Sequence, residues 1–141
     1  MSTKSFKTSL RVTWADTDAA GVVHYSNYFR FFERAEEEFY ASLGFTFTDL
    51  RDSGLWLPRV EAFCQYKKPS RYNDVLEIEV SVEDLREKVF RLGFKVTNKS
   101  SGDLLASGHL VIVAADKQAG KATKIPSSIL EKLRPFAKQI L

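Results

Sequence analysis

The sequence predicts an α+β domain in which a curved antiparallel sheet of about five strands wraps around one long central helix. Three observations predict this fold. Apolar residues recur at helical spacing between residues 28 and 43, and four later segments show strand patterns. A shorter helical segment, at about 127–137, closes the chain. At 141 residues the chain is long enough to bury a core, so we expect a single domain spanning 1–141.

The first element is expected to be a strand at residues 6–14. Apolar and polar side chains alternate there, from Phe6 through Trp14, which is typical of a strand with one buried face. Residues 15–26 then form a polar loop that contains Asp16 and Asp18.

The long helix extends from Tyr28 to about Leu43. Its apolar residues follow the three-and-four spacing of a single helical face, and they are Phe31, Phe32, Ala35, Phe39 and Leu43. Ser26 or Asn27 is placed to cap its start, and Gly44 is placed to end it in a left-handed conformation. Glu36 lies at the edge of the apolar face, so we expect it to be paired or to lie at an interface.

The remaining strands are expected in near-meander succession at 57–66, 75–83, 90–97 and 104–115. Turn-forming residues separate them, at 67–74, 85–88 and 98–102. A short helical turn is expected near 48–52, in the connection that precedes these strands. The segment 104–115 is apolar on both faces, which indicates a central strand or a subunit contact.

Composition excludes several classes of protein. The net charge of +3 is small and its carriers are scattered, which does not suit a nucleic-acid-binding protein but does suit a ligand that carries phosphates. The single Cys64 excludes an intrachain disulfide framework and a multi-cysteine metal site. The first ten residues have no apolar signal-peptide segment, and no run approaches the length of a membrane span. We therefore expect a soluble cytoplasmic protein without membrane insertion.

The loop before the long helix carries the candidate chemistry. It brings the carboxylates of Asp16 and Asp18 close to a helix start, where free N–H groups and the positive end of the helix dipole gather. This combination suits the activation of a carbonyl group. The alternative is that both aspartates cap turns, as acids before Ala-Gly often do.

The segment from Asp16 to Tyr28, DTDAAGVVHYSNY, is followed by the aromatic and acidic helix segment FFERA at 31–35. Together they resemble the signature of the 4-hydroxybenzoyl-CoA thioesterase family, and most closely its bacterial branch associated with the Tol–Pal system. The order of elements is similar to that family's hotdog fold. The resemblance implies acyl-CoA as substrate and a homodimer or homotetramer, a dimer of dimers, with active sites between subunits. It also implies no metal and no redox cofactor.

The resemblance also assigns candidate site residues. The family's catalytic aspartate matches Asp18, and its peptide N–H that polarises the thioester carbonyl matches the backbone of Tyr25. Basic residues that hold the CoA phosphates match Arg86 and Lys88, although Glu87 stands between them. Several members carry histidine and tyrosine in the reverse order of His24 and Tyr25, which leaves His24 open between a catalytic role and a hydrogen-bonded interface role.

Two further residues of the motif have two open roles each. Gly21 serves either close backbone approach to the ligand or a positive φ, and Asn27 either orients the loop or caps the helix. Asp18 acts either as a nucleophile toward the thioester carbonyl or as a general base toward water. For Asp16 we expect a turn or hydrogen-bonding role.

Other candidate residues are assigned structural roles. We expect Glu36 to be a paired structural glutamate rather than a second site carboxylate, and His109 to be a satisfied core or interface histidine. Cys64 is expected to be inert, since no motif surrounds it. The cluster of Lys67, Lys68 and Arg71 either approaches the nucleotide of CoA or is a solvated turn.

The leading hypothesis is a thioesterase that hydrolyses an acyl-CoA. Acyl carrier protein thioesters are an alternative substrate, and a non-catalytic acyl-CoA-binding module is an alternative function. A related dehydratase is disfavoured because it would need a histidine on the long helix, and residues 28–43 contain none.

Overall fold

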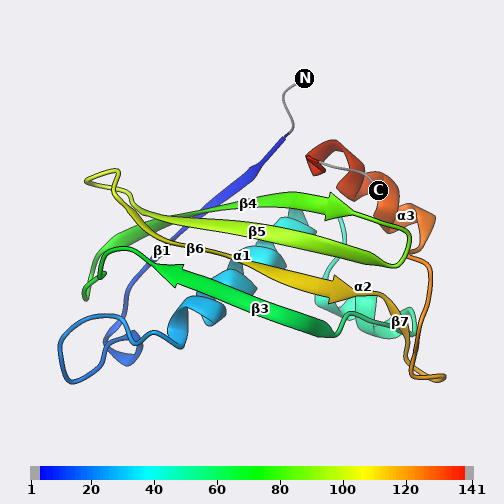
Figure 1. Cartoon of the computed structure of the whole chain (residues 1–141), viewed down its shortest axis with the longest axis horizontal. Helices are drawn as coiled ribbons and strands as arrows, with labels where there is room; N and C mark the ends of the chain where they lie inside the picture. Colours follow the sequence, from blue (N-terminus) through cyan, green and yellow to red (C-terminus); the bar gives the residue numbers. More distant parts are fainter. Residues whose placement is uncertain (1–3, 139–141) are drawn as a thin grey trace.

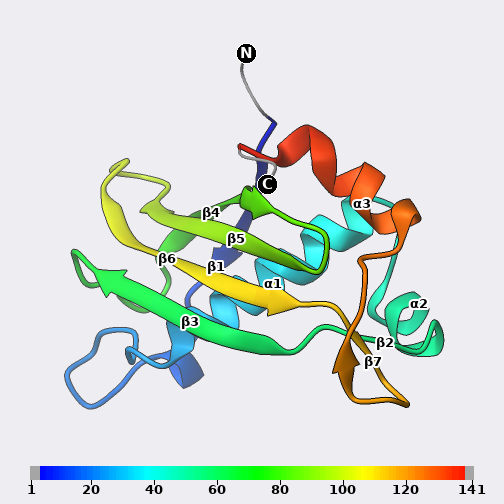
Figure 2. The ribbon, with the colours of Figure 1, turned by 45° about the vertical axis from the view of Figure 1, so that its right-hand side comes forward.

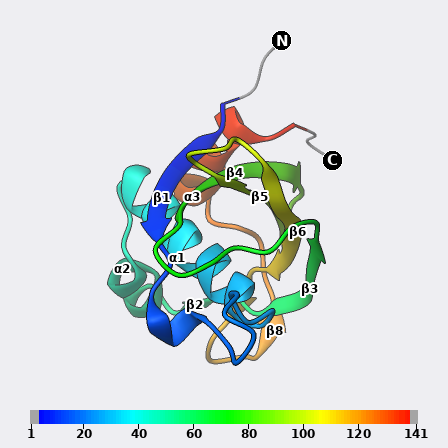
Figure 3. The ribbon, with the colours of Figure 1, turned by 90° about the vertical axis from the view of Figure 1, so that its left-hand side faces the viewer.

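The computed structural model describes residues 4–138. Its main feature is an antiparallel sheet in the order β1-β4-β5-β6-β3. The strands are β1 (Phe6–Arg11), β3 (Arg59–Tyr66), β4 (Val75–Leu85), β5 (Val89–Asn98) and β6 (Leu104–Val113). Seen end-on, the sheet curls around the helix α1 (Asn27–Ser42), which lies on its concave side (Figure 3). This arrangement confirms the α+β fold class predicted from the sequence.

The core forms between α1 and the concave face of the sheet. Phe31, Phe32 and Phe39 are almost completely buried, at 1%, 0% and 0% exposure. The Phe32 ring stacks on that of Phe94 from β5, with 4.4 Å between the ring centroids. The inward residues of β4, which the alternation predicted to be buried, are indeed buried: Leu76, Ile78, Val80 and Val82.

The two ends of α1 are built differently from each other. Gly44, just beyond the helix, has φ +93°, so the predicted left-handed ending is confirmed. The predicted side-chain cap at the start is wrong. Ser26 occupies the N-cap position but its side chain makes no capping bond, and Asn27 instead donates from Nδ2 to the carbonyl of Asp16 at 2.8 Å. Asn27 thus orients the loop rather than capping the helix.

The sheet is not the simple meander expected from the strand order. Strands β4, β5 and β6 are successive neighbours, but β3 pairs with β6 at the far edge. The place beside β4 is taken by β1, with Phe6 opposite Val80. The strand that precedes β4 in sequence therefore cannot pair with it, and the loop at residues 67–74 connects the two distant strands.

Three predicted strands are shorter than expected. The first ends at Arg11, and Trp14 begins a 3-10 turn (η1, Trp14–Asp16) with its side chain 78% exposed rather than buried. The strand expected at 57–66 begins only at Arg59, after Pro58, which has no N–H to donate. The strand expected at 104–115 ends at Val113, and a small separate sheet is formed by β7 (Ala115–Asp116) with β2 (Leu55–Trp56) and β8 (Lys121–Ala122).

The two ends of the sheet carry different elements (Figures 1 and 2). The loop that precedes α1 lies at one end of the sheet. The other end carries α2 (Phe47–Asp52), β2, β7, the β4–β5 turn and the first turn of α3 (Ser127–Leu133). A 3-10 turn, η2 (Arg134–Phe136), follows α3, so the predicted closing helix is confirmed in position but is interrupted near Pro135. No helix within residues 4–138 is long and apolar enough to cross a bilayer.

Candidate active site

Asp16 holds the loop together. Its side-chain Oδ2 accepts from the N–H of Thr13 at 2.8 Å and from the Thr13 hydroxyl at 3.0 Å. Its carbonyl accepts from the His24 N–H at 2.9 Å and from the Asn27 side chain. Both oxygen-bearing groups of Asp16 are engaged in fixing the loop against the start of α1, which supports the turn role expected for it.

Asp18 begins a tight turn over residues 18–22. Its N–H donates to the Val22 carbonyl at 2.9 Å, and its Oδ1 accepts from the Ala20 N–H at 2.8 Å. Gly21 closes the turn with φ +82°, and a Cβ there would meet no atom within 4 Å. A positive φ, rather than close packing, is therefore what requires glycine at this position within the chain.

The second oxygen of the Asp18 carboxylate, Oδ2, accepts no hydrogen bond within residues 4–138, and the side chain is exposed. The Tyr25 N–H is also without a partner, because it donates to no acceptor in the described part of the chain. The first turn of α1 contains no acidic residue to offset the positive end of its dipole. The loop therefore presents one available carboxylate oxygen and one available amide donor.

His24 lies between these two groups in sequence. Its Nδ1 accepts from the Ser26 N–H at 3.2 Å and lies 2.7 Å from the Ser26 hydroxyl. Its ring stacks on that of Tyr25, with 4.3 Å between the centroids. Because Nδ1 accepts a backbone bond, the neutral imidazole carries its proton on Nε2. This arrangement gives His24 a role in shaping the loop.

Three contacts hold the loop and the start of α1 against the end of β3 and the segment that follows it, and sequence analysis did not find the one made by β3 itself. The Tyr66 hydroxyl, at the end of β3, donates to the Tyr25 carbonyl at 2.8 Å. The Val23 N–H donates to the Ser70 carbonyl at 2.8 Å, and the Ser70 hydroxyl lies 2.8 Å from that of Tyr28. Desolvation is the main cause that raises the pKa of Tyr66 to about 12, so it stays a protonated donor. No local pattern identifies Tyr66, because the contact joins residues far apart in sequence.

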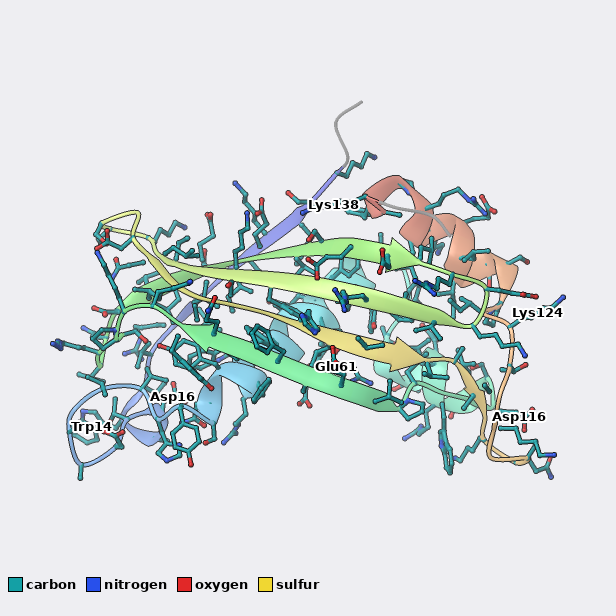
Figure 4. The ribbon with its side chains drawn as sticks, viewed as in Figure 1. Trp14, Asp16, Glu61, Asp116, Lys124 and Lys138 are labelled. Carbon is teal, nitrogen blue, oxygen red and sulfur yellow. The ribbon has the colours of Figure 1, made fainter. Side chains whose placement is uncertain are left out.

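Arg86 and Lys88 lie elsewhere in the chain. They belong to the β4–β5 turn, at the end of the sheet opposite to Asp16, near Lys124 (Figures 1 and 4). Backbone bonds at 2.8 Å from Arg86 to Val89 and from Ala114 to Lys88 fix this turn. The intervening Glu87 pairs with Lys124 at 3.2 Å, so its charge is partly offset. One chain therefore does not bring the predicted phosphate-binding residues to the loop at 16–26.

Glu36 is buried and paired, as expected from its place on the apolar face. Its Oε2 accepts from the Arg59 guanidinium and, at 2.5 Å, from the Tyr40 hydroxyl. Burial raises the pKa of Tyr40 well above its ordinary value, which keeps this hydroxyl a donor. The hydrogen-bonded cluster around Glu36 therefore lies near the middle of α1, away from the loop at 16–26.

Two further candidates from the sequence, His109 and Cys64, lie outside the loop at 16–26. His109 lies on β6 and its Nε2 is 2.5 Å from Glu61, which projects from the outer side of the sheet (Figure 4). Burial raises the pKa of the Cys64 thiol, which makes the nucleophilic thiolate scarcer.

Comparison with known proteins identifies the family. The sequence profile of the thioesterase-like superfamily matches residues 12–133, which include α1, the loop before it and every strand of the five-stranded sheet except β1. The chain belongs to the thioesterase-like superfamily. The resemblance inferred from Asp16–Tyr28 is therefore confirmed at the level of family and fold.

Members of this superfamily match along almost the full length of the chain. A crystal structure of a hypothetical protein from Aquifex aeolicus is 38% identical, with a TM-score of 0.86 over 91% of this chain and 98% of that one. A gentisyl-coenzyme A thioesterase structure is 36% identical, with a TM-score of 0.80 over 88% and 98%. The acyl-CoA thioester hydrolase YbgC of Escherichia coli is 28% identical over 95% of this chain and 99% of its own length.

Proposed function

We propose that this protein is an acyl-CoA thioesterase that hydrolyses a thioester to the free acid and CoA. The observation that carries the proposal is that one loop presents both an available Asp18 oxygen and an available Tyr25 amide just before α1. Relatives with gentisyl-CoA thioesterase and acyl-CoA thioester hydrolase activity support it.

Each group has a defined part in the reaction. The Tyr25 N–H donates to the thioester oxygen and stabilises the negative charge that develops on it. Asp18 acts from the other side of the carbonyl by one of two routes. As a nucleophile it forms a mixed anhydride and releases CoA thiolate, and water then hydrolyses the anhydride. As a general base it removes a proton from the attacking water.

The direct test is the release of free thiol from a panel of acyl-CoA esters. The proposal expects multiple turnovers, with the free acid and CoA formed in equal amounts. A non-catalytic acyl-CoA-binding module would bind the same esters without releasing thiol. Turnover of acyl carrier protein thioesters but not of acyl-CoA would instead support the alternative substrate. Because the free Cys64 thiol suits a reducing compartment, we place the activity in the cytoplasm.

A second copy of the chain would complete the site. In one chain Asp18 is exposed and Tyr25 is 66% exposed, which leaves the reacting groups open to water. The edge strand β3 carries exposed Val60 and Phe63, at 64% and 48%. Two copies that pair their β3 edges around a two-fold axis run antiparallel there, so the far end of one lies beside the loop end of the other. We therefore propose a homodimer, or a dimer of dimers, as the active form.

The same pairing gives Arg86 and Lys88 a function. In such a dimer the β4–β5 turn of one subunit approaches the loop of the other, where its two cations can hold the CoA phosphates. Replacing both by alanine is expected to raise KM for acyl-CoA about 10-fold, because charge-assisted contacts are lost. The salt dependence of KM should weaken in parallel. The measurement is steady-state thiol release at several ionic strengths.

Two controls make this test specific. A thioester of N-acetylcysteamine lacks the phosphates, so its KM should not respond to the double substitution. Lys7→Ala removes an exposed cation on β1, at the edge of the sheet opposite to β3, and should leave both KM values as they are. An unchanged KM for acyl-CoA in the double variant would place phosphate binding elsewhere.

Tyr66 is expected to act as a positioning residue. Tyr66→Phe removes the hydroxyl that holds the Tyr25 carbonyl and should lower kcat about 3- to 10-fold, the value of one hydrogen bond, with little change in KM. Tyr72→Phe is the matched control, since Tyr72 is similarly exposed, at 47% against 44%. Equal kcat values in the two variants, at equal unfolding midpoints, would show that the Tyr66–Tyr25 hydrogen bond does not position the amide.

A further inference from the structure

A cavity of about 760 Å³ lies beside α1. The elements α2 and β2, which contribute to its lining, lie at the end of the sheet away from the loop (Figure 2). One wall is formed by α1, and the opposite wall is formed by α2 and the segment 55–59. Leu50, Leu55, Trp56 and Leu57 make this opposite wall largely apolar. The volume is in the range of small-molecule sites, which are typically apolar with a few fixed polar groups.

The fixed polar group of this cavity is Glu36. Its carboxylate is 3% exposed, and only its Oε2 is engaged, by Arg59 and Tyr40. Its Oε1 is buried and has no hydrogen-bond partner in the described part of the chain. Leaving a buried acceptor of a charged group unpaired is costly, so this unpaired oxygen of a residue that lines the cavity indicates a missing donor.

We propose that the cavity receives the distal end of the acyl group, and that a hydroxyl at that end donates to Glu36 Oε1. The inference rests on the proposed thioesterase function and adds a substrate class to it: medium-length acyl groups with a distal hydroxyl. A neutral donor fits best. An ammonium group would meet the Arg59 guanidinium beside the carboxylate, and an ionised acid would meet the acceptor-only oxygen of Glu36.

The position of Glu36 along α1 sets the length of the acyl group. With a rise of about 1.5 Å per residue, Glu33 lies about 9 Å and Glu36 about 13 Å along the helix from Asn27. Glu33 lines the same cavity, so the cavity begins about one helical turn before its polar group. An acyl group with its carbonyl at the Tyr25 amide must therefore extend well beyond one aromatic ring to reach Glu36.

The test compares two esters that differ in one hydroxyl. For the wild-type protein, kcat/KM for 10-hydroxydecanoyl-CoA should exceed that for decanoyl-CoA about 10-fold or more, the value of a hydrogen bond to a charged group. Equal values for the two esters would overturn the inference and would indicate that the cavity holds only water at Glu36.

An apolar-floor variant, Glu36→Met/Tyr40→Phe/Arg59→Met, removes the whole polar group, and only the Leu57 carbonyl, to which Arg59 also donates, loses a partner. It should bring the ratio of the two kcat/KM values close to one. The matched control is Glu38→Met, an exposed glutamate on the same helix that does not line the cavity, and it should keep the wild-type ratio. A wild-type ratio in the apolar-floor variant would overturn the inference.

A second variant keeps the test valid if the apolar-floor variant does not fold. Leu57→Trp fills the cavity from its apolar wall and should lower kcat/KM for both decanoyl esters about 10-fold relative to acetyl-CoA. An unchanged ratio would contradict the inference. Failure of the thioesterase proposal is distinguishable, because no ester would then release thiol. Calorimetry with 10-hydroxydecanoic and decanoic acids would still decide whether the cavity binds the hydroxylated chain more tightly.

Discussion

Asp18→Asn is expected to lower kcat by about 10²- to 10⁴-fold, the usual contribution of a positioned acid–base or nucleophilic group. The amide retains the shape of the side chain and can still accept the Ala20 N–H through its oxygen, so the turn over residues 18–22 should persist. What is lost is the negative charge that the proposed mechanism needs to attack the carbonyl or to activate the water. Thiol release from an acyl-CoA measures kcat, and KM should change much less.

Asp116→Asn is a close control for this experiment. Asp116 also begins a tight turn, in which its Oδ1 accepts from the N–H groups of Gln118 and Ala119, but it lies at the opposite end of the sheet. Its substitution should leave kcat unchanged. A kcat for Asp18→Asn that equals that of the Asp116 variant would remove Asp18 from the reaction.

The sequence predicted those features that depend on neighbouring residues. The spacing of Phe31, Phe32 and Phe39 identified α1, and the alternation in β4 identified its buried face. The motif from Asp16 to Tyr28 identified the family, because it combines a turn, a helix start and two acids in a fixed order. These are local properties, and local physical chemistry determines them.

The features that sequence analysis missed depend on distant contacts. Strand β3 was expected beside β4. In the structure β1 takes that position, and β3 pairs with β6 instead. No pattern within residues 59–66 indicates which of these strands is the neighbour. Trp14 was expected to be buried by continuing the alternation of β1, but the strand ends at Arg11 where pairing with β4 stops. The Tyr66–Tyr25 hydrogen bond and the Arg59–Glu36 pair likewise depend on where β3 lies relative to the loop and to α1.

The same reasoning explains why the predicted site residues fall into two groups. Asp18, Gly21, His24, Tyr25 and Asn27 belong to one motif, and one loop holds them together. Arg86 and Lys88 were assigned by resemblance alone, and one chain places them at the far end of the sheet. A sequence contains no direct signal for which residues meet across a two-fold axis, so only the dimer proposal connects the two groups.

Gly108→Ala is expected to destabilise the protein by about 3 kcal/mol, at the upper end of what overpacking costs. Gly108 lies on β6 between β3 and β5, and a Cβ there would lie 2.1 Å from the Phe63 carbonyl oxygen of β3. It would also lie 2.9 Å from the Phe32 ring of α1, which is itself stacked on Phe94. Neither neighbour can move freely, because one is backbone in a paired strand and the other is fully buried. Denaturant unfolding measures the change.

Ser107→Ala provides the comparison for this variant. Ser107 is the preceding residue on β6, so its side chain points to the opposite face of the sheet, where it is only half-buried. Its substitution should change the free energy of unfolding by less than about 0.5 kcal/mol. A displaced β3 also carries Tyr66 away from Tyr25, so the Gly108 variant should lose activity at temperatures where it remains folded. Equal stability of the two variants would mean that β3 and α1 are not held against β6 as closely as the distances require.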